Sequence, residues 1–269
     1  MNVILKSVLL ALCLITCDKQ QETYNYLREI SVTTITNSGH SGSAVIITRE
    51  IGDKKINFAI SSAHVYEPIM QTIIVEDDAL KEITIFPKIK ALQFKDDLDE
   101  PIVTDAYILL IEAEKDLCLL VLDDIVTEES VRFSTERSKV FDEIYHMGSL
   151  AGLDGQDSLS TGIISFISRK LENLEVDQTT VPVGKGSSGG GMFVSDGKCI
   201  GITIAMAGCS TSFMVPSEHV IDWLETSEFS WLLDVSEETP TIEELNKKHI
   251  DNIVKERPIN QKETLKETP

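Results

Sequence analysis

Short runs of alternating or wholly apolar residues dominate the pattern of hydrophobic and polar positions in the first half of the chain. A polar stretch centred on Gly52 and Asp53 separates two such runs and predicts a β-hairpin. None of the runs keeps a helical period, so they predict six or more short antiparallel strands, which is typical of a β-barrel. The expected strands span residues 28–36, 43–48, 56–61, 72–75, 82–86, 106–112 and 117–122.

The second half of the chain has the same character. It follows a polar and charged stretch, residues 123–139, that predicts a connection between two halves. Gly-rich turns separate the apolar runs beyond it, and these runs predict a second barrel. Its expected strands span residues 143–147, 158–167, 191–194, 200–206 and 212–215.

Helical patterns come only after these strands. Residues 217–225 predict a short helix packed on the second barrel, because three apolar side chains share one face. Thr241 to Glu244 form a capping-box pattern before further apolar residues, so a second helical segment is expected up to about residue 257. Residues 258–269 predict a disordered tail.

The chain begins MNVILKSVLLALCLITCDKQ, with an apolar run from Val8 to Ile15. This run is too short to cross a bilayer, which needs ~20 residues, so residues 1–17 predict a signal peptide. Leu-Ile-Thr-Cys ending at Cys17 resembles a bacterial lipobox, which implies a lipid on Cys17 and a mature protein anchored to a membrane surface in the periplasm. Thr16 departs from the usual small residue, so secretion without a lipid and an uncleaved N-terminus stay open.

Composition narrows the class of protein. With 269 residues, 42% hydrophobic and 25% charged, the chain is expected to be globular, with room for one large or two small domains. A formal net charge of -20 and a pI near 4.6 would repel nucleic acid. We therefore expect no nucleic-acid partner.

The cysteine and histidine positions predict neither a structural disulfide nor a metal site. Cys118 is expected to face the core, while Cys199 and Cys209 flank a strand whose extended length holds them apart. The histidines show no metal-ligand spacing such as H-E-x-x-H. No metal or cofactor is expected.

Residues 184–191 read Gly-Lys-Gly-Ser-Ser-Gly-Gly-Gly and carry the clearest chemical signal in the chain. A serine between glycines can occupy a sharp turn that exposes its hydroxyl and directs nearby N–H groups to one point. Upstream, His64 follows an apolar strand and Asp116 opens another. The order His64, Asp116, Ser188 resembles that of the trypsin-like serine proteases.

The second half narrows this resemblance to the HtrA/Deg-type bacterial proteases. Gly-Ser-Leu-Ala-Gly-Leu at 148–153 and Thr-Gly-Ile-Ile-Ser at 161–165 are similar to their second-barrel entry, and Phe-Met-Val-Pro-Ser at 213–217 is similar to a closing strand. The resemblance covers residues 39–217 and is loose between 66 and 104.

The resemblance implies an all-β fold of two six-stranded antiparallel β-barrels, the trypsin-like fold, with a short C-terminal helical segment. A protease domain is expected over residues 25–257, with barrel one at about 28–122, barrel two at about 140–217 and helices at about 217–257. About fifty residues follow Ser217, too few for the PDZ domain that such proteases usually carry.

The resemblance also implies a role for each matched residue. Ser188 is the expected nucleophile, His64 the general base, and Asp116 the carboxylate that orients and stabilises the imidazole. Asp105 is a rival for the last role, but only the residues after Asp116 match the family block. The backbone N–H groups of Gly186 and Ser188 are expected to form the oxyanion hole.

The same alignment predicts which side chains contact the substrate residue before the scissile bond, namely Pro182, Val183, Ser212 and Phe213. Pro182 stands where trypsins have an acidic group. We therefore expect the substrate residue before the scissile bond to be small or medium and apolar, and not Lys or Arg. Ser187 replaces the aspartate that pairs with a freed N-terminal amine in digestive trypsins, so activation by that route is not expected.

Three other interpretations stay open. The glycines around Ser188 also fit G-x-S-x-G, the nucleophile elbow of α/β-hydrolases, whose partners would have to be Asp234, His219 or His249. A Gly/Ser turn can also be an ordinary turn. The expected function is an extracytoplasmic serine endopeptidase that processes proteins or controls their quality; the third alternative is a catalytically silent protease-fold module that binds peptides or a partner protein.

Overall fold

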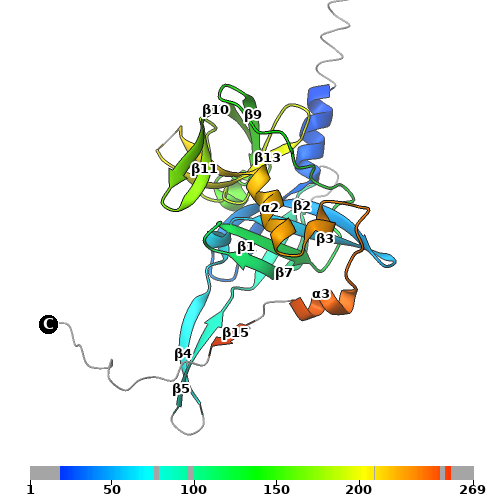
Figure 1. Cartoon of the computed structure of the whole chain (residues 1–269), viewed down its shortest axis with the longest axis vertical. Helices are drawn as coiled ribbons and strands as arrows, with labels where there is room; N and C mark the ends of the chain where they lie inside the picture. Colours follow the sequence, from blue (N-terminus) through cyan, green and yellow to red (C-terminus); the bar gives the residue numbers. More distant parts are fainter. Residues whose placement is uncertain (1–18, 76–78, 96–99, 209, 249–251, 256–269) are drawn as a thin grey trace, which may run out of the picture.

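The computed structural model describes residues 19–75, 79–95, 100–208, 210–248 and 252–255. Within them the strands close into two six-stranded antiparallel barrels, so the predicted fold class is confirmed (Figure 1). Barrel one has the order β1-β2-β3-β8-β7-β6 and consists of β1 (Ser31–Thr36), β2 (Ser41–Ile51), β3 (Lys54–Ser61), β6 (Ile89–Gln93), β7 (Ile102–Glu112) and β8 (Leu117–Leu122). Barrel two has the order β10-β11-β14-β13-β12-β9 and consists of β9 (Glu143–Gly148), β10 (Ser158–Leu171), β11 (Leu174–Thr179), β12 (Gly191–Phe193), β13 (Cys199–Met206) and β14 (Ser212–Pro216).

This architecture excludes the α/β-hydrolase interpretation. A nucleophile elbow joins a strand to a helix at the top of an α/β sheet. Here the turn that holds Ser188 leads into β12, and β12 pairs antiparallel with both β9 and β13. The serine turn therefore belongs to a β-barrel.

Strand β8 shows how the two barrels pack against each other. All of its residues are buried. Successive side chains point to opposite faces of a strand, and every second side chain of β8 fills the interior of barrel one while the others join the larger cluster that spans both barrels. Burial on both faces explains why this segment reads as a continuous apolar run.

Two segments expected as strands of barrel one lie elsewhere. β4 (Ile69–Val75) and β5 (Ala79–Ile85) form a hairpin that projects from the body of the molecule and pairs with β15 (Asn252–Lys255) in a separate three-stranded sheet (Figure 1). The barrels instead include β6 and β11, which the sequence pattern did not predict. Charged residues interrupt their apolar positions, such as Asp177 in β11, which is buried and paired with Arg137 at 2.8 Å.

The N-terminal segment is helical up to residue 29, although a strand was expected from residue 28. Residues 19–29 form a helix, so β1 begins at Ser31 and not at residue 28. Leu27 and Ile30 are buried in the cluster that spans both barrels. Tertiary packing of this segment therefore outweighs its strand-like alternation.

The C-terminal helices agree with the prediction only in part. α2 (Ser217–Thr226) packs on β13 and β14, as expected. α3 (Ile242–Lys248) begins with the predicted capping box: Thr241 Oγ1 accepts the N–H of Glu244 at 3.2 Å, and Glu244 Oε2 accepts the N–H of Thr241 at 2.8 Å. The prediction of helix up to residue 257 is wrong, because the backbone of β15 pairs with β5.

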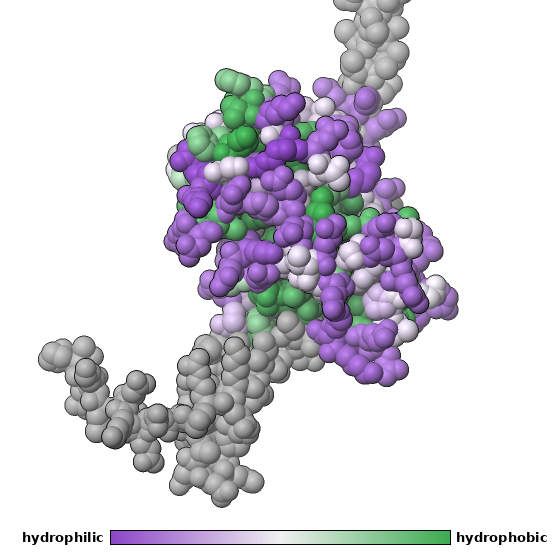
Figure 2. All heavy atoms as spheres, viewed as in Figure 1, coloured by the Kyte–Doolittle hydropathy of each residue, from purple (hydrophilic) through white to green (hydrophobic). Residues whose placement is uncertain are grey.

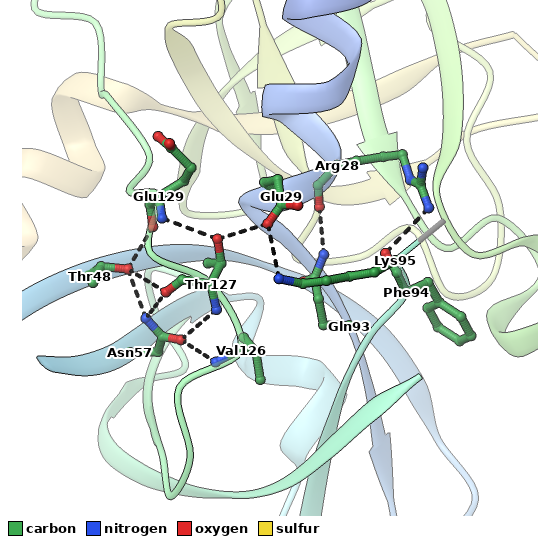
Figure 3. A network of polar contacts seen from close by, with 10 residues as sticks. All are labelled: Arg28, Glu29, Thr48, Asn57, Gln93, Phe94, Lys95, Val126, Thr127 and Glu129. Carbon is green, nitrogen blue, oxygen red and sulfur yellow. Dashed lines mark hydrogen bonds and ion pairs between the residues drawn. The ribbon is translucent and has the colours of Figure 1, made fainter. Parts of the chain in front are cut away.

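Asn57 in β3 fixes the connection between the barrels (Figure 3). Its side-chain oxygen accepts the N–H groups of Val126 at 2.7 Å and Thr127 at 3.2 Å, and its side-chain nitrogen donates to Thr48 Oγ1 at 2.7 Å. Thr127 Oγ1 in turn donates to Glu29 at 3.0 Å, at the end of the N-terminal helix. Since buried polar groups need partners, this network determines the path of the chain from one barrel to the other.

Hydrophilic side chains cover most of the molecular face drawn in Figure 2, in keeping with the formal net charge of -20. Among the helical residues that the structure describes, none forms a helix of the length and apolarity that crossing a membrane requires.

Several predictions fall on residues outside the described ranges. These are the signal peptide, Cys17 with its lipid, Cys209 and the tail from residue 258. Of the other cysteines, Cys118 faces the core as expected, and both Cys118 and Cys199 are free, buried thiols.

Candidate active site

His64 and Asp116 come together because their strands are neighbours in barrel one. β3 pairs antiparallel with β8, with Ser61 opposite Cys118. The end of β3 and the start of β8 therefore lie at the same edge, where the short helix η1 (Ala63–Tyr66) carries His64. Asp116 has a φ of 51°, a left-handed conformation that aspartate accepts more readily than most residues.

The turn of residues 184–190 brings Ser188 from barrel two to the same edge. Gly189 has a φ of 87°, and a Cβ there would lie 2.0 Å from the carbonyl oxygen of Ser43, so glycine is required. The N–H of Ser43 in β2 donates to the carbonyl oxygen of Ser188 at 2.7 Å, and the N–H of Gly189 donates to Thr203 O in β13 at 2.7 Å. Both barrels therefore hold the serine turn.

Asp116, His64 and Ser188 form a continuous hydrogen-bonded line. His64 Nδ1 lies 2.8 Å from Asp116 Oδ2 and 3.0 Å from Oδ1, and His64 Nε2 lies 2.9 Å from Ser188 Oγ. A carboxylate only accepts, so we assign the hydrogen to Nδ1 and leave the lone pair of Nε2 facing the serine hydroxyl. The rival Asp105 is instead paired with Lys90 at 3.0 Å.

The surroundings of His64 favour its cationic form. The hydrogen bond to Asp116 raises the pKa of His64 above its ordinary value; burial opposes this rise, and the carboxylate charge adds to it. The side chain of His64 is 40% exposed and that of Asp116 is 18% exposed. The imidazole can therefore exchange protons with a substrate, while its carboxylate partner is largely shielded.

Among residues 186–190 of the serine turn, the backbone N–H groups of Gly186 and Ser188 have no hydrogen-bond acceptor within the described residues. Those of Ser187, Gly189 and Gly190 each have one. The carbonyl oxygen of Lys185 accepts the N–H of Ala151 at 2.8 Å. The C=O and N–H of a trans peptide point in opposite directions, so this bond turns the N–H of Gly186 the other way. The arrangement leaves two donors beside Ser188 for a ligand oxygen.

The four predicted substrate-contacting residues differ in burial. Pro182 is exposed and Val183 is half-buried. Ser212 and Phe213 on β14 are buried; Ser212 Oγ donates to the carbonyl oxygen of Val181 at 3.0 Å, and Phe213 packs in the cluster that spans both barrels. Their contact with a substrate stays a prediction.

A cavity of about 910 Å³ borders Asp116. Its walls come from residues 112–116 before β8, residues 171–174 at the β10–β11 turn, and residues 204 and 205 of β13. Of the three hydrogen-bonded side chains, Asp116 lines this cavity, and His64 and Ser188 do not.

Three hydroxyl side chains of the site were not predicted, those of Ser43, Ser61 and Tyr66. Ser43 Oγ donates to the carbonyl oxygen of Gly186 at 2.7 Å and accepts the N–H of Ser149 at 2.8 Å. Behind it, the hydroxyl of Tyr66 donates to Ser61 Oγ at 2.9 Å, and Ser61 Oγ donates to Ser43 O at 2.7 Å. These residues lie in or beside strands without any motif, so the sequence holds no signal for them.

Several solved structures share this fold. Rv3671c from M. tuberculosis H37Rv, an inactive form of a serine-to-alanine mutant, is 13% identical with a TM-score of 0.56, over 81% of this chain and 93% of that one. Deg5 is 16% identical with a TM-score of 0.56, over 76% of this chain and 91% of that one. A serine endoprotease from Yersinia pestis is 16% identical with a TM-score of 0.53, over 78% of this chain and 66% of that one. At such identities the likeness shows the fold alone.

The sequence itself matches the family described as the trypsin-like peptidase domain, over residues 55–202. No curated protein matches the chain. Because the family match covers more than half of the chain, the protein belongs to the trypsin-like peptidase family and is a serine-type endopeptidase. The resemblance to trypsin-like proteases, with a Deg-type protein among the structural neighbours, is confirmed, and the described residues after Ser217 contain no PDZ domain.

Proposed function

We propose that this protein hydrolyses peptide bonds in proteins with Ser188 as the nucleophile, His64 as the general base and Asp116 as the orienting carboxylate. The observation that carries the proposal is the hydrogen-bonded line from Asp116 through His64 to Ser188, with links of 2.8 Å and 2.9 Å. Ser188 alone is a poor nucleophile, and a neutral imidazole within hydrogen-bond reach supplies the base that it needs. A module that only binds peptides has no need for this arrangement.

In the first half of the proposed reaction, Ser188 Oγ attacks the substrate carbonyl carbon while its proton passes to His64 Nε2. The charge on the carbonyl oxygen is stabilised by the N–H groups of Gly186 and Ser188, and one such donor contributes ~3 kcal/mol. His64 then gives its proton to the leaving amine nitrogen as the C–N bond breaks. Water repeats these steps against the acyl-enzyme and releases the carboxylic acid, with Asp116 stabilising the imidazolium throughout.

Active-site labelling tests this assignment. A fluorophosphonate probe should label the wild-type protein and the Ser236→Ala control, whose serine is exposed and bonds to Asp234. It should not label Ser188→Ala. Peptide hydrolysis should follow the same pattern. If the wild-type protein takes up no probe while it binds peptides, the silent-module alternative replaces this proposal.

We further propose that the protein acts outside the cytoplasm, in the processing or quality control of other proteins. The apolar run from Val8 to Ile15 and the lipobox-like Cys17 support export and lipid attachment, which would leave residues 25–257 as the protease domain. Mass spectrometry of the mature N-terminus checks this: a lipidated Cys17 supports anchorage, an unmodified Met1 contradicts export with cleavage, and cleavage beyond Cys17 contradicts the lipid.

The proposed substrate preference is a small or medium apolar residue before the scissile bond. Neither Pro182 nor Val183 carries a charge that could pair with a substrate Lys or Arg, and a buried cation without a partner is costly. Cleavage-site profiling on denatured proteins should therefore show apolar residues at this position. A dominant Lys or Arg signal would contradict the preference without affecting the proposed triad.

A further inference from the structure

His146 is a buried histidine that the proposed mechanism does not use. It lies in β9, opposite Ser160 of β10 and Met192 of β12, and its exposure is 0%. Alternate residues of a strand share a face, so His146 points in the same direction as Ile144, which belongs to the core of barrel two. An imidazole therefore lies at the end of an apolar barrel interior.

The ring of His146 lies directly against the serine turn. A Cβ at Gly190 would be 2.6 Å from His146 Nε2, and a Cβ at Gly148 would be 2.7 Å from His146 Cε1. Side chains do not fit at such distances, so both glycines leave the space that the imidazole fills. Nε2 lies 3.4 Å from the carbonyl oxygen of Ser187, and since a carbonyl only accepts, Nε2 carries the hydrogen and donates it.

The carbonyl of Ser187 and the N–H of Ser188 belong to the same peptide group. In a trans peptide the two point in opposite directions. His146 Nε2 and the N–H of Gly190, at 3.0 Å, hold the carbonyl oxygen inside the protein. The N–H of Ser188 therefore points away from these internal donors, and rotation of this peptide by half a turn would replace that N–H with an oxygen.

We propose that His146 is a positioning residue for the oxyanion hole, which keeps the N–H of Ser188 directed at the substrate by donating from Nε2 to the carbonyl of Ser187. This inference rests on the proposed function, because that function gives the N–H of Ser188 its role.

The surroundings of His146 keep this donor neutral. Its Nδ1 is buried without a hydrogen-bond partner, and burial lowers the pKa of His146 to about 4. Ser160 and Met192, opposite His146 in the neighbouring strands, carry no charge, and neither do the two glycines against the ring. The ring therefore donates one hydrogen bond to the serine turn without placing a charge behind it.

Three substitutions of His146 separate positioning from packing. His146→Gln places an amide nitrogen near the position of Nε2 and keeps the donor, whereas His146→Asn places it near Nδ1, where nothing accepts. His146→Leu removes the donor and leaves an apolar side chain in the barrel. Ile144→Ala is the matched control, because it removes core contacts from the same face of the same strand and leaves the imidazole in place.

The kinetic test is a separate measurement of kcat and KM for each variant. Removal of a whole oxyanion donor lowers kcat ~10²- to 10³-fold, so loosening one should lower it about 10- to 100-fold in His146→Leu and His146→Asn. KM should stay near the wild-type value, since ground-state binding does not use this donor. His146→Gln should recover most of kcat, and Ile144→Ala should keep a wild-type kcat at temperatures where it is folded.

A second readout does not need turnover. The N–H of Gly190 bonds to the same carbonyl of Ser187 as His146 does, so it should exchange with solvent hydrogen faster in His146→Leu and not in Ile144→Ala. A wild-type kcat in His146→Leu, or a His146→Gln protein as slow as His146→Asn, overturns the positioning role. If the wild-type protein itself has no turnover, the proposed function fails, and unchanged exchange at Gly190 in His146→Leu would then overturn this inference as well.

Discussion

The two histidines on either side of the serine turn are the same side chain in opposite environments. His64, at the edge of barrel one, is 40% exposed and bonded to the carboxylate of Asp116, which raises its pKa. His146, inside barrel two, has 0% exposure and no ionised partner, so its pKa falls to about 4. Exposure and a charged partner make an imidazole that can accept a proton near neutral pH. Burial without a charged partner makes a hydrogen-bond donor that is neutral at that pH.

The largest expected effect is the loss of kcat when His64, and not His146, is substituted. His64→Ala should lower kcat about 10⁶-fold, as expected when the base of a serine-protease triad is lost, whereas substitutions of His146 should have a far smaller effect. Single-turnover acylation with a peptide ester measures the difference, and circular dichroism checks that both variants are folded. A kcat in His64→Ala similar to that in His146→Leu would contradict the comparison.

Removal of the charge on Asp116 should have the next largest effect. Asp116→Asn should lower kcat about 10⁴-fold, because an amide can donate to Nδ1 and so favours the wrong tautomer of His64. Asp105→Asn is the control, since this aspartate is paired with Lys90 on the surface and not with an imidazole. Equal loss of kcat in both variants would remove Asp116 from the triad.

The burial of His146 should appear as acid sensitivity of the fold. Its pKa is lowered from 6.5 to about 4, so between these pH values the unfolded chain binds a proton that the folded chain does not, and stability falls as the pH falls. This difference corresponds to about 3 kcal/mol of unfolding free energy. Urea denaturation at both ends of this pH window should compare wild type with His146→Leu. Because the carboxylates titrate in both proteins, the comparison isolates the contribution of His146. If the difference in unfolding free energy between wild type and His146→Leu is the same at both ends of this pH window, His146 is not held neutral.

The smallest effect should be a shift in the acid limb of kcat/KM. His64 must be neutral to act as a base, so activity should fall as the pH drops through a raised pKa, above 6.5. The charge of Glu67 contributes least to this rise, and Glu67→Gln should move the limb slightly to lower pH. The titration of His64 affects stability in the opposite direction to that of His146. The stabilisation that His64 contributes is fully present below pH 6.5 and is lost as the pH rises through its raised pKa.

The sequence predicted best those elements whose signal is local. β2 and β3 flank a turn at Gly52, and the continuous apolar run of β8 follows Asp116 directly. The capping box at Thr241 also needs only residues within one turn of helix. The pattern failed for β6 and β11, because charged residues in these strands find partners only in the folded barrel, as Asp177 does with Arg137.

The sequence by itself determined the two barrels, the order of the three proposed triad residues and the serine turn, because short-range patterns of burial and glycine conformation encode them. Only the tertiary structure decided which strands close barrel one, where the β4–β5 hairpin pairs, and which polar groups hold the serine turn. Ser43 reaches Gly186 across 143 positions and His146 reaches Ser187 across 41. A single polar residue in a strand carries no local mark of such a partner. The contact of His146 exists only once barrel two has closed, and that of Ser43 only once the two barrels have packed together.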